Sequence, residues 1–148
     1  MIEINGMAHV MLTVSAWEKC RPLYEALLPF LGLKQVFGTE DFIYYVGGRT
    51  ALGLRRCEER LAGRRFVQGE LGLHHLCFRC RSREDVDSVY EFLKQQEVTI
   101  VRPPEDGPWA PGYYSFLVED PSGIRIEFNF VPGKGMIEEG AKFTPTGL

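Results

Sequence analysis

Two histidines and one glutamate stand at matching places in the two halves of this chain. His9 opens the apolar segment 9–14, and His75 opens a similar segment, 75–80. Glu127 lies in the segment 124–131, near the end of the second half. Imidazole and carboxylate groups are ligands for Zn²⁺, Fe²⁺, Mn²⁺ and Ni²⁺, and three of them leave positions open for water and substrate. The pattern predicts a divalent-metal site of His9, His75 and Glu127, in which Glu127 is also the candidate catalytic group.

Side chains alternate between the two faces of a strand, and this alternation places the three candidate ligands on the faces opposite the apolar residues of their strands. Leu76 and Phe78 form an apolar side opposite His75, and Ile126 and Phe128 do the same opposite Glu127. The segment that begins at His9 has the same alternation. We therefore expect the apolar sides to meet helices and the three candidate ligands to face a cleft.

Further polar side chains fall on the cleft side by the same rule. They are the candidate substrate-binding residues Arg55, Arg79, Tyr113 and Ser115, with Arg125 in an equivalent position. The arginines predict an anionic substrate; the alternative is that they lie at strand ends and reach solvent. The placement of Tyr113 and Ser115 requires the sequence Asp-Pro-Ser-Gly at 120–123 to form a type I turn with a glycine bulge, which pairs Leu117 with Glu127.

Three other residues near this cleft could have a structural role in place of a binding role. His74 falls on the helix side and is interpreted as a residue of the core or rim. Trp109, beside Tyr113, either covers a bound ring or anchors its loop. Tyr44 faces the cleft if Gly47-Gly48 is the two-residue turn of its hairpin.

The elements that position these residues repeat in the same order in both halves. The first half predicts a strand, a helix capped by Ser15 and closed by Gly32, and three strands. Pro22 predicts a late start or a kink in that helix. The second half predicts a strand, a helix capped by Ser82, a short strand ended by the prolines after Arg102, and a hairpin. The predicted strands are 8–14, 33–38, 42–46, 50–55, 73–80, 99–102, 113–119 and 124–131.

The length and composition suit one compact domain. The chain has 148 residues, 45% hydrophobic, and a net charge of −3, which argues against nucleic acid as a partner. No apolar run is long enough to span a membrane, and no secretory signal opens the chain, so a cytoplasmic location is expected. The four cysteines suggest reduced thiols rather than a disulfide framework.

In these motifs the chain resembles the vicinal oxygen chelate superfamily, which includes glyoxalase I, bleomycin-resistance proteins and extradiol dioxygenases. The resemblance is carried by His-Val-Met-Leu-Thr-Val from His9, by Leu-Gly-Leu at 31–33, by His-Leu-Cys-Phe from His75, and by Asp-Pro-Ser-Gly through Glu127. It implies an α+β fold of two tandem βαβββ modules whose mixed sheet curls around a central cleft. The implied single domain is 1–131, with module one at 1–56, a linker at 57–72 and module two at 73–131, followed by a Gly/Pro-rich tail at 132–148.

Carried over residue by residue, the superfamily's ligands fall on His9, His75 and Glu127, and its fourth ligand falls on Gly53. Glycine has no side chain to ligate, which weighs against glyoxalase I chemistry with two carboxylates. The resemblance also implies homodimers, with metal sites inside one chain or shared between two.

The leading functional hypothesis is a metalloenzyme that chelates two vicinal oxygens of a small substrate on a divalent metal, for lyase, addition or ring-opening chemistry. The alternative is a metal-free protein of the bleomycin-resistance type that sequesters a small molecule. A regulatory module that uses the sheet face for a protein partner is a third possibility.

Overall fold

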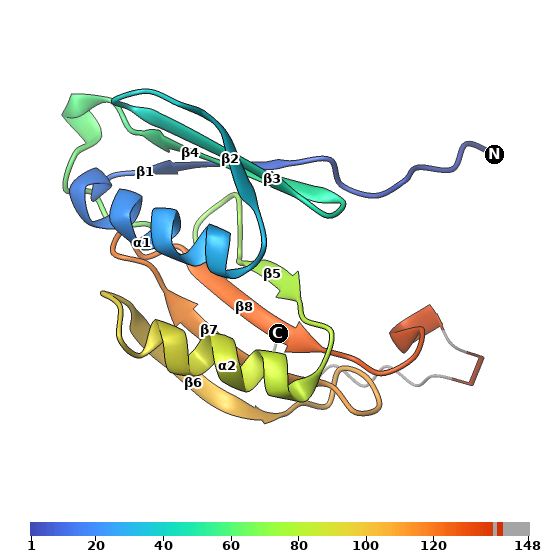
Figure 1. Cartoon of the computed structure of the whole chain (residues 1–148). Helices are drawn as coiled ribbons and strands as arrows, with labels where there is room; N and C mark the ends of the chain where they lie inside the picture. The colour runs from blue at the N-terminus through green and yellow to red at the C-terminus, as the bar shows by residue number, and fades with distance from the viewer. Residues whose placement is uncertain (138, 141–148) are drawn as a thin grey trace. The chain divides into compact units, whose positions relative to one another are not determined.

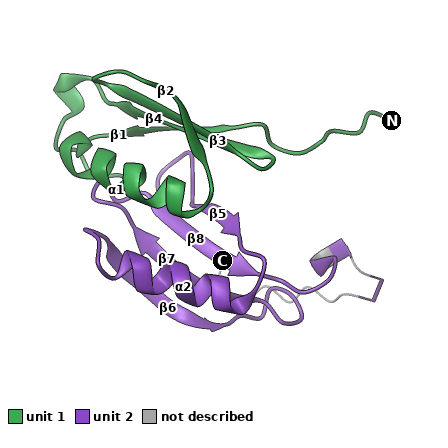
Figure 2. Cartoon of the chain, viewed as in Figure 1, with its two compact units in different colours: residues 1–66 green, residues 67–148 purple. Residues whose placement is uncertain are grey.

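The computed structural model describes residues 1–137 and 139–140 (Figure 1). The chain divides into two compact units, 1–66 and 67–148 (Figure 2). Each unit has the predicted order of one strand, one helix and three strands, and each holds its own four-stranded mixed sheet. The α+β class and the two tandem βαβββ modules are therefore confirmed. Part of the predicted tail, residues 138 and 141–148, lies outside the described residues.

The sheet of the first unit has the strand order β1-β4-β3-β2, with β1 parallel to β4 and the other neighbours antiparallel. Helix α1 packs on β2 and β4. Leu12 and Val14 of β1 and Leu52 and Leu54 of β4 are buried, which confirms that their side of the sheet is apolar. The elements are β1 (Val10–Val14), α1 (Trp17–Phe30), β2 (Lys34–Gly38), β3 (Phe42–Gly47), β4 (Thr50–Arg56) and the 3₁₀ turn η1 (Glu59–Leu61).

The second unit repeats this topology in the order β5-β8-β7-β6. Helix α2 packs on β6, β7 and β8, and the stacked rings of Phe116 and Phe128 lie at the centre of the core, with centroids 5.0 Å apart. The elements are β5 (Leu76–Arg79), α2 (Arg83–Leu93), β6 (Thr99–Asp106), β7 (Tyr114–Glu119), β8 (Arg125–Phe130) and the 3₁₀ turn η2 (Gly135–Ile137).

The two helix starts differ from each other, although the sequence predicts a serine cap for both. Ser82 caps α2 as expected, because its Oγ accepts a bond from the Asp85 amide at 3.1 Å. Ser15 does not cap α1: the N-cap residue is Ala16, and the Ser15 hydroxyl donates to the carbonyl of Arg64 instead. The Ser15 prediction was wrong because a more distant carbonyl competes for the same hydroxyl.

Prolines interrupt the elements less than predicted. Helix α1 begins at Trp17 and continues through Pro22, so the helix does not start late. Strand β6 continues through Pro103 and Pro104 to Asp106, with register shifts after Ile100 and Arg102. Because β6 is an edge strand, it tolerates residues without an N–H where no neighbour needs one. The predicted end of this strand at Arg102 was wrong.

Two turns test the predicted register. The hairpin between β3 and β4 turns at Gly48-Arg49, since Gly47 pairs with Thr50, and the predicted turn at Gly47-Gly48 was one residue early. Tyr44 still shares the face of its partner Gly53, because the register moves by an even number of residues. The hairpin between β7 and β8 has the predicted glycine bulge, with Gly123 at φ 92°, and pairs Leu117 with Glu127.

Among the described residues, no helix combines the length and the apolar character that crossing a membrane requires. The cytoplasmic location stays a prediction.

Candidate metal centre and pocket of the second unit

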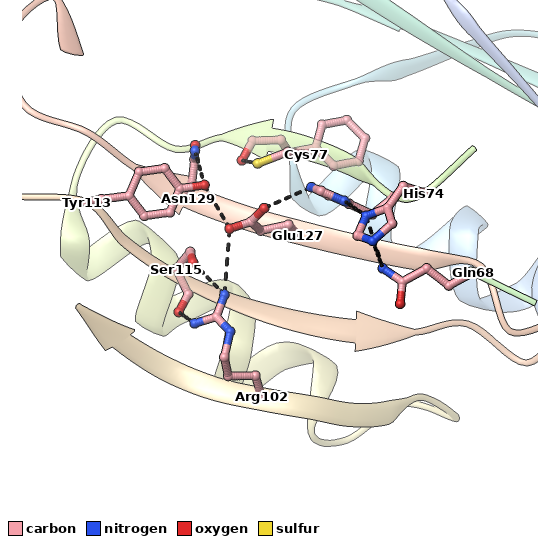
Figure 3. A network of polar contacts seen from close by, with 10 residues as sticks. Gln68, His74, Cys77, Arg102, Tyr113, Ser115, Glu127 and Asn129 are labelled. Carbon is pink, nitrogen blue, oxygen red and sulfur yellow. Dashed lines mark hydrogen bonds and ion pairs between the residues drawn. The ribbon is translucent and has the colours of Figure 1, made fainter. Parts of the chain in front are cut away.

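Glu127 is the centre of a polar network on the face of the second sheet opposite α2 (Figure 3). It stands in the middle of β8, directly opposite Leu117 of β7 and beside Cys77 of β5. Its side chain is 10% exposed, so each carboxylate oxygen needs a partner from the protein or a ligand. The alternation along β8 explains the placement, since Ile126 and Phe128 point the other way into the core.

His75 contacts one oxygen of this carboxylate. It lies immediately before β5, and its Nε2 is 3.1 Å from Glu127 Oε2. Two donor atoms bound to one ion at roughly 2.1 Å lie about 3.0–3.4 Å apart at ordinary coordination angles. The pair is therefore spaced either for a direct hydrogen bond or for two positions around one divalent metal.

Tyr113 fixes the other oxygen. Its hydroxyl donates to Glu127 Oε1 at 2.8 Å and accepts a bond from Asn129 Nδ2 at 2.9 Å. Burial, together with the bond to Glu127, raises the pKa of Tyr113, so its hydroxyl stays protonated at neutral pH. The Asn129 Oδ1 atom is buried and has no hydrogen-bond partner among the described residues.

Arg102 supplies a positive charge next to Glu127. Its Nη2 lies 3.6 Å from Glu127 Oε1 and 2.7 Å from the Oγ of Ser115, which is fully buried. Its Nη1 donates to the Ser115 carbonyl at 3.0 Å. Ser115 thus holds the guanidinium in place as Figure 3 shows, and the predicted substrate-binding residue acts here as the support of an arginine.

A chain of hydrogen bonds leads from His75 to the other side of the pocket. His75 Nδ1 lies 2.7 Å from His74 Nδ1, and Gln68 Nε2 lies 2.8 Å from His74 Nε2. Arg125 donates to Gln68 Oε1 and therefore orients that amide with its nitrogen toward His74. With Gln68 donating to His74 Nε2, His74 donates from Nδ1 to His75 Nδ1, and His75 donates from Nε2 to Glu127. A metal ligand at Nε2 needs the opposite tautomer, in which His75 donates from Nδ1 to His74.

These residues line a pocket of about 560 Å³, a volume typical of small-molecule sites. Trp109 and Tyr113 form an aromatic wall with centroids 5.1 Å apart. The lining residues are Gln68, His74, His75, Arg102, Trp109, Tyr113, Leu117, Arg125 and Glu127.

The predicted site residues are divided between the units. Glu127, His75, Tyr113 and Ser115 come together in the second unit, whereas His9 and Arg55 belong to the first. Arg79 is in the second unit, but it is exposed and donates to the carbonyl of Val131 at 2.9 Å instead of lining the pocket.

In the first unit, His9 is exposed beside Tyr44, with ring centroids 6.4 Å apart. Gly53, at the position of the superfamily's fourth ligand, is buried, and a Cβ built there would overlap the Met11 side chain. Within residues 1–137 and 139–140, no group of three His, Cys, Asp or Glu side chains could hold a metal ion. His75 and Glu127 fit two positions of such a site, and the role of His9 as a third ligand stays a prediction.

Sequence reasoning missed Arg102 and His74. Arg102 precedes two prolines, which predicted the end of its strand, and His74 was interpreted as a core or rim residue because strand alternation was extended to it. It lies before β5 begins, where alternation no longer applies. A pair of adjacent histidines ahead of a strand was the signal available in the sequence.

Residues 6–128 match the sequence profile of the Glyoxalase/Bleomycin resistance protein/Dioxygenase superfamily. The uncharacterized protein YqjT of Bacillus subtilis (strain 168) is 28% identical over 124 residues, covering 82% of this chain and 95% of YqjT. The crystal structure of a glyoxalase candidate from Bacillus halodurans superposes with a TM-score of 0.72 at 29% identity, covering 86% of this chain and 96% of that one. Lactoylglutathione lyase from Agrobacterium tumefaciens shares the fold, with a TM-score of 0.63 at 19% identity over 86% of this chain and 95% of its own.

Proposed function

The chain belongs to the Glyoxalase/Bleomycin resistance protein/Dioxygenase superfamily, and we propose that it is a divalent-metal-dependent enzyme whose substrate is a small molecule with two neighbouring oxygen atoms. The membership confirms the resemblance to the vicinal oxygen chelate superfamily. The metal dependence and the type of substrate are our proposals.

The single observation that carries this proposal is the His75–Glu127 pair at the pocket. The 3.1 Å between Nε2 and Oε2 suits two ligands of one ion, and both residues line a pocket of about 560 Å³ with room for a substrate. Nitrogen and carboxylate donors suit Zn²⁺, Fe²⁺, Mn²⁺ or Ni²⁺. When bound, such an ion supplies Lewis-acid chemistry by polarising an oxygen of the substrate.

The protein groups around Glu127 prepare it for this role. Tyr113 holds Oε1, so Oε2 is the oxygen left for the position shared with His75. Desolvation and the nearby carboxylate of Glu127 raise the pKa of the Cys77 thiol. Burial likewise raises the pKa of the Tyr113 hydroxyl. Both groups keep their protons at neutral pH, which leaves Glu127 as the acidic side chain of the pocket that can accept a proton from a substrate.

Gly53 narrows the reaction class. An isomerisation that moves a proton between two carboxylates needs a second acid, and the superfamily position for it is a glycine with Met11 in the adjacent space. We therefore favour a lyase, addition or ring-opening reaction, in which one base is sufficient.

A metal-free binding protein is the second candidate. The direction of the hydrogen bonds from Gln68 through His74 and His75 to Glu127 favours it. The positive charge of Arg102 lies 3.6 Å from Glu127, His75 contacts the other carboxylate oxygen at 3.1 Å, and Gln68 directs the proton of His75 toward that carboxylate. A protein that sequesters a small molecule needs no metal and no second base.

Elemental analysis of untagged protein, purified without added metal, separates these candidates. The proposal expects about one divalent ion per chain or per dimer, and its loss in His75→Ala and Glu127→Gln. Glu91→Gln is the matched control, because Glu91 pairs with Lys94 on an exposed face of α2. Absence of bound divalent metal in the wild type, after the protein has also been offered Zn²⁺, Mn²⁺, Fe²⁺ and Ni²⁺, overturns the enzyme proposal. Ligand-induced thermal stabilisation that survives EDTA would then support sequestration.

A further inference from the structure

We infer that the pocket of the second unit selects a planar compound that carries a carboxylate, with the carboxylate bound by Arg102 and the plane lying against Trp109. The inference names the substrate class of the proposed site and rests on that site being the binding pocket. Neither residue belongs to the predicted metal ligands.

Among the described residues, no hydrogen bond occupies the edge of Arg102 formed by Nε and Nη2, and Glu127 lies 3.6 Å from Nη2. Arg102 Nη1 donates to the Ser115 carbonyl at 3.0 Å, and Arg102 Nη2 donates to the Ser115 hydroxyl at 2.7 Å. Nη1 also donates to the carboxylate of Glu105 at 3.3 Å. A guanidinium has five N–H donors, so one on Nε and one on Nη2 remain. These two are adjacent and form an edge that binds a carboxylate through two parallel bonds.

The same contacts hold this edge in place before a ligand arrives. Arg102 is 21% exposed, and its two bonds to the buried Ser115 fix the guanidinium against β7. Glu127 is 3.6 Å from Nη2, beyond a good hydrogen bond, so it attracts the arginine without occupying its free donors. A pre-positioned donor pair loses little side-chain entropy when it binds.

Trp109 adds a flat apolar surface next to that edge. The Arg102 guanidinium carbon lies 5.5 Å from the centroid of the indole, and Tyr113 meets the indole edge-on with the two rings 63° apart. The chain makes room for this arrangement at Gly107, where a Cβ would overlap the six-membered ring of Trp109. With Leu117 on the same lining, the wall suits a ring or another conjugated plane.

The charges of the pocket agree with an anion. The pocket lining contains two arginines, Arg102 and Arg125, and one carboxylate, Glu127. The lining is therefore more positive than the whole chain, which carries a net charge of −3. Arg125 is paired with Glu119 at 2.9 Å and with Gln68, so of the two arginines in the described lining Arg102 is the one placed to bind an anion.

Ligand-observed NMR titrations with three probes test this inference on the full chain in EDTA. Benzoate is planar and anionic, benzamide is planar and neutral, and cyclohexanecarboxylate is anionic but not planar. We expect benzoate to bind at least about tenfold more tightly than either of the others. Working in EDTA separates the outcomes, because loss of the metal proposal would leave this binding intact.

Arg102→Gln should weaken benzoate binding about tenfold or more, since hydrogen bonds between charged groups are lost, and should leave benzamide binding unchanged. Trp109→Leu should weaken both planar probes. Arg83→Gln is the matched control, because Arg83 also pairs with an acid, Asp106 at 2.5 Å, and lies over a ring, Tyr114 at 3.8 Å, but outside the pocket.

Circular dichroism and thermal melting establish that Arg102→Gln is folded. Arg102→Lys is the second variant, and we expect intermediate affinity because it keeps the charge and loses the paired donors. Equal binding of the three probes, no detectable benzoate binding, or equal effects of Arg102→Gln and Arg83→Gln would each overturn the inference.

Discussion

The hydroxyl of Tyr113 donates to Glu127 Oε1 at 2.8 Å while it accepts from Asn129 at 2.9 Å. This single group therefore fixes a carboxylate from one side and satisfies an amide from the other. Tyr113 comes from the end of the loop before β7, whereas Glu127 and Asn129 belong to β8. The contact ties the pocket loop, with Trp109 in it, to the sheet that carries the candidate metal ligand.

Tyr113→Phe should lower both stability and metal affinity. The change leaves Glu127 Oε1 and Asn129 Nδ2 without this partner, and a lost buried hydrogen bond costs about 1–3 kcal/mol of unfolding free energy. Loss of a group that orients a metal ligand typically lowers metal affinity about 10–100-fold. Urea denaturation and a competitive metal titration measure the two effects.

Tyr90→Phe is the matched control for that variant. Tyr90 packs edge-on against Phe116 beneath Lys94 and lies outside the pocket, so its loss should leave metal affinity unchanged. Equal metal affinities of Tyr113→Phe and wild type would show that Tyr113 does not position Glu127.

The two serines before the helices should respond differently to alanine. Ser82→Ala removes a side-chain cap of α2 and should cost about 1 kcal/mol of unfolding free energy. Ser15→Ala removes a bond to an exposed carbonyl and should cost less than about 0.5 kcal/mol. Chemical denaturation of both variants checks the difference, and equal losses would mean that Ser15 does cap α1 in solution.

The alternation of side chains predicted much of the second sheet. It placed Glu127, Tyr113 and Ser115 on one face and Phe116 and Phe128 on the other, and the glycine bulge after Asp120 gave the correct pairing. Alternation succeeds here because strand geometry is local and the turn residues at 120–123 specify one register.

The residues that complete the pocket could not be derived in that way. Arg102 lies opposite Leu117, on the face that carries Glu127, because the register of β6 shifts between Ile100 and Arg102, and His74 reaches Gln68 through a segment without regular structure. Both placements depend on contacts between distant parts of the chain, and alternation along a strand carries no information about them.

The space next to Gly53 is filled by the end of the Met11 side chain. A Cβ at Gly53 would overlap the thioether of Met11 and lie 3.0 Å from Tyr44 Cδ2. Gly53→Ala should cost less than about 1 kcal/mol of unfolding free energy, because the overlapping atoms are the end of the flexible Met11 side chain, which is 46% exposed and can move aside. In a double-mutant cycle, Met11→Ala should relieve most of this cost, because the overlapping atoms are removed. The same loss in both backgrounds would exclude Met11 as the cause.

The thiol of Cys80 should be slow to alkylate in the native protein. Burial, with a smaller contribution from Asp85, raises the pKa of Cys80 to about 11. The thiolate is the reactive form, so a higher pKa lowers the reactive fraction at pH 8 by roughly 200-fold relative to an ordinary thiol with a pKa of about 8.5. Iodoacetamide labelling followed by peptide mass spectrometry should give a native rate that rises about tenfold per pH unit between pH 8 and 10. Labelling of urea-unfolded protein at pH 8 provides the reference, and native and unfolded rates within threefold of each other would contradict the burial of this thiol.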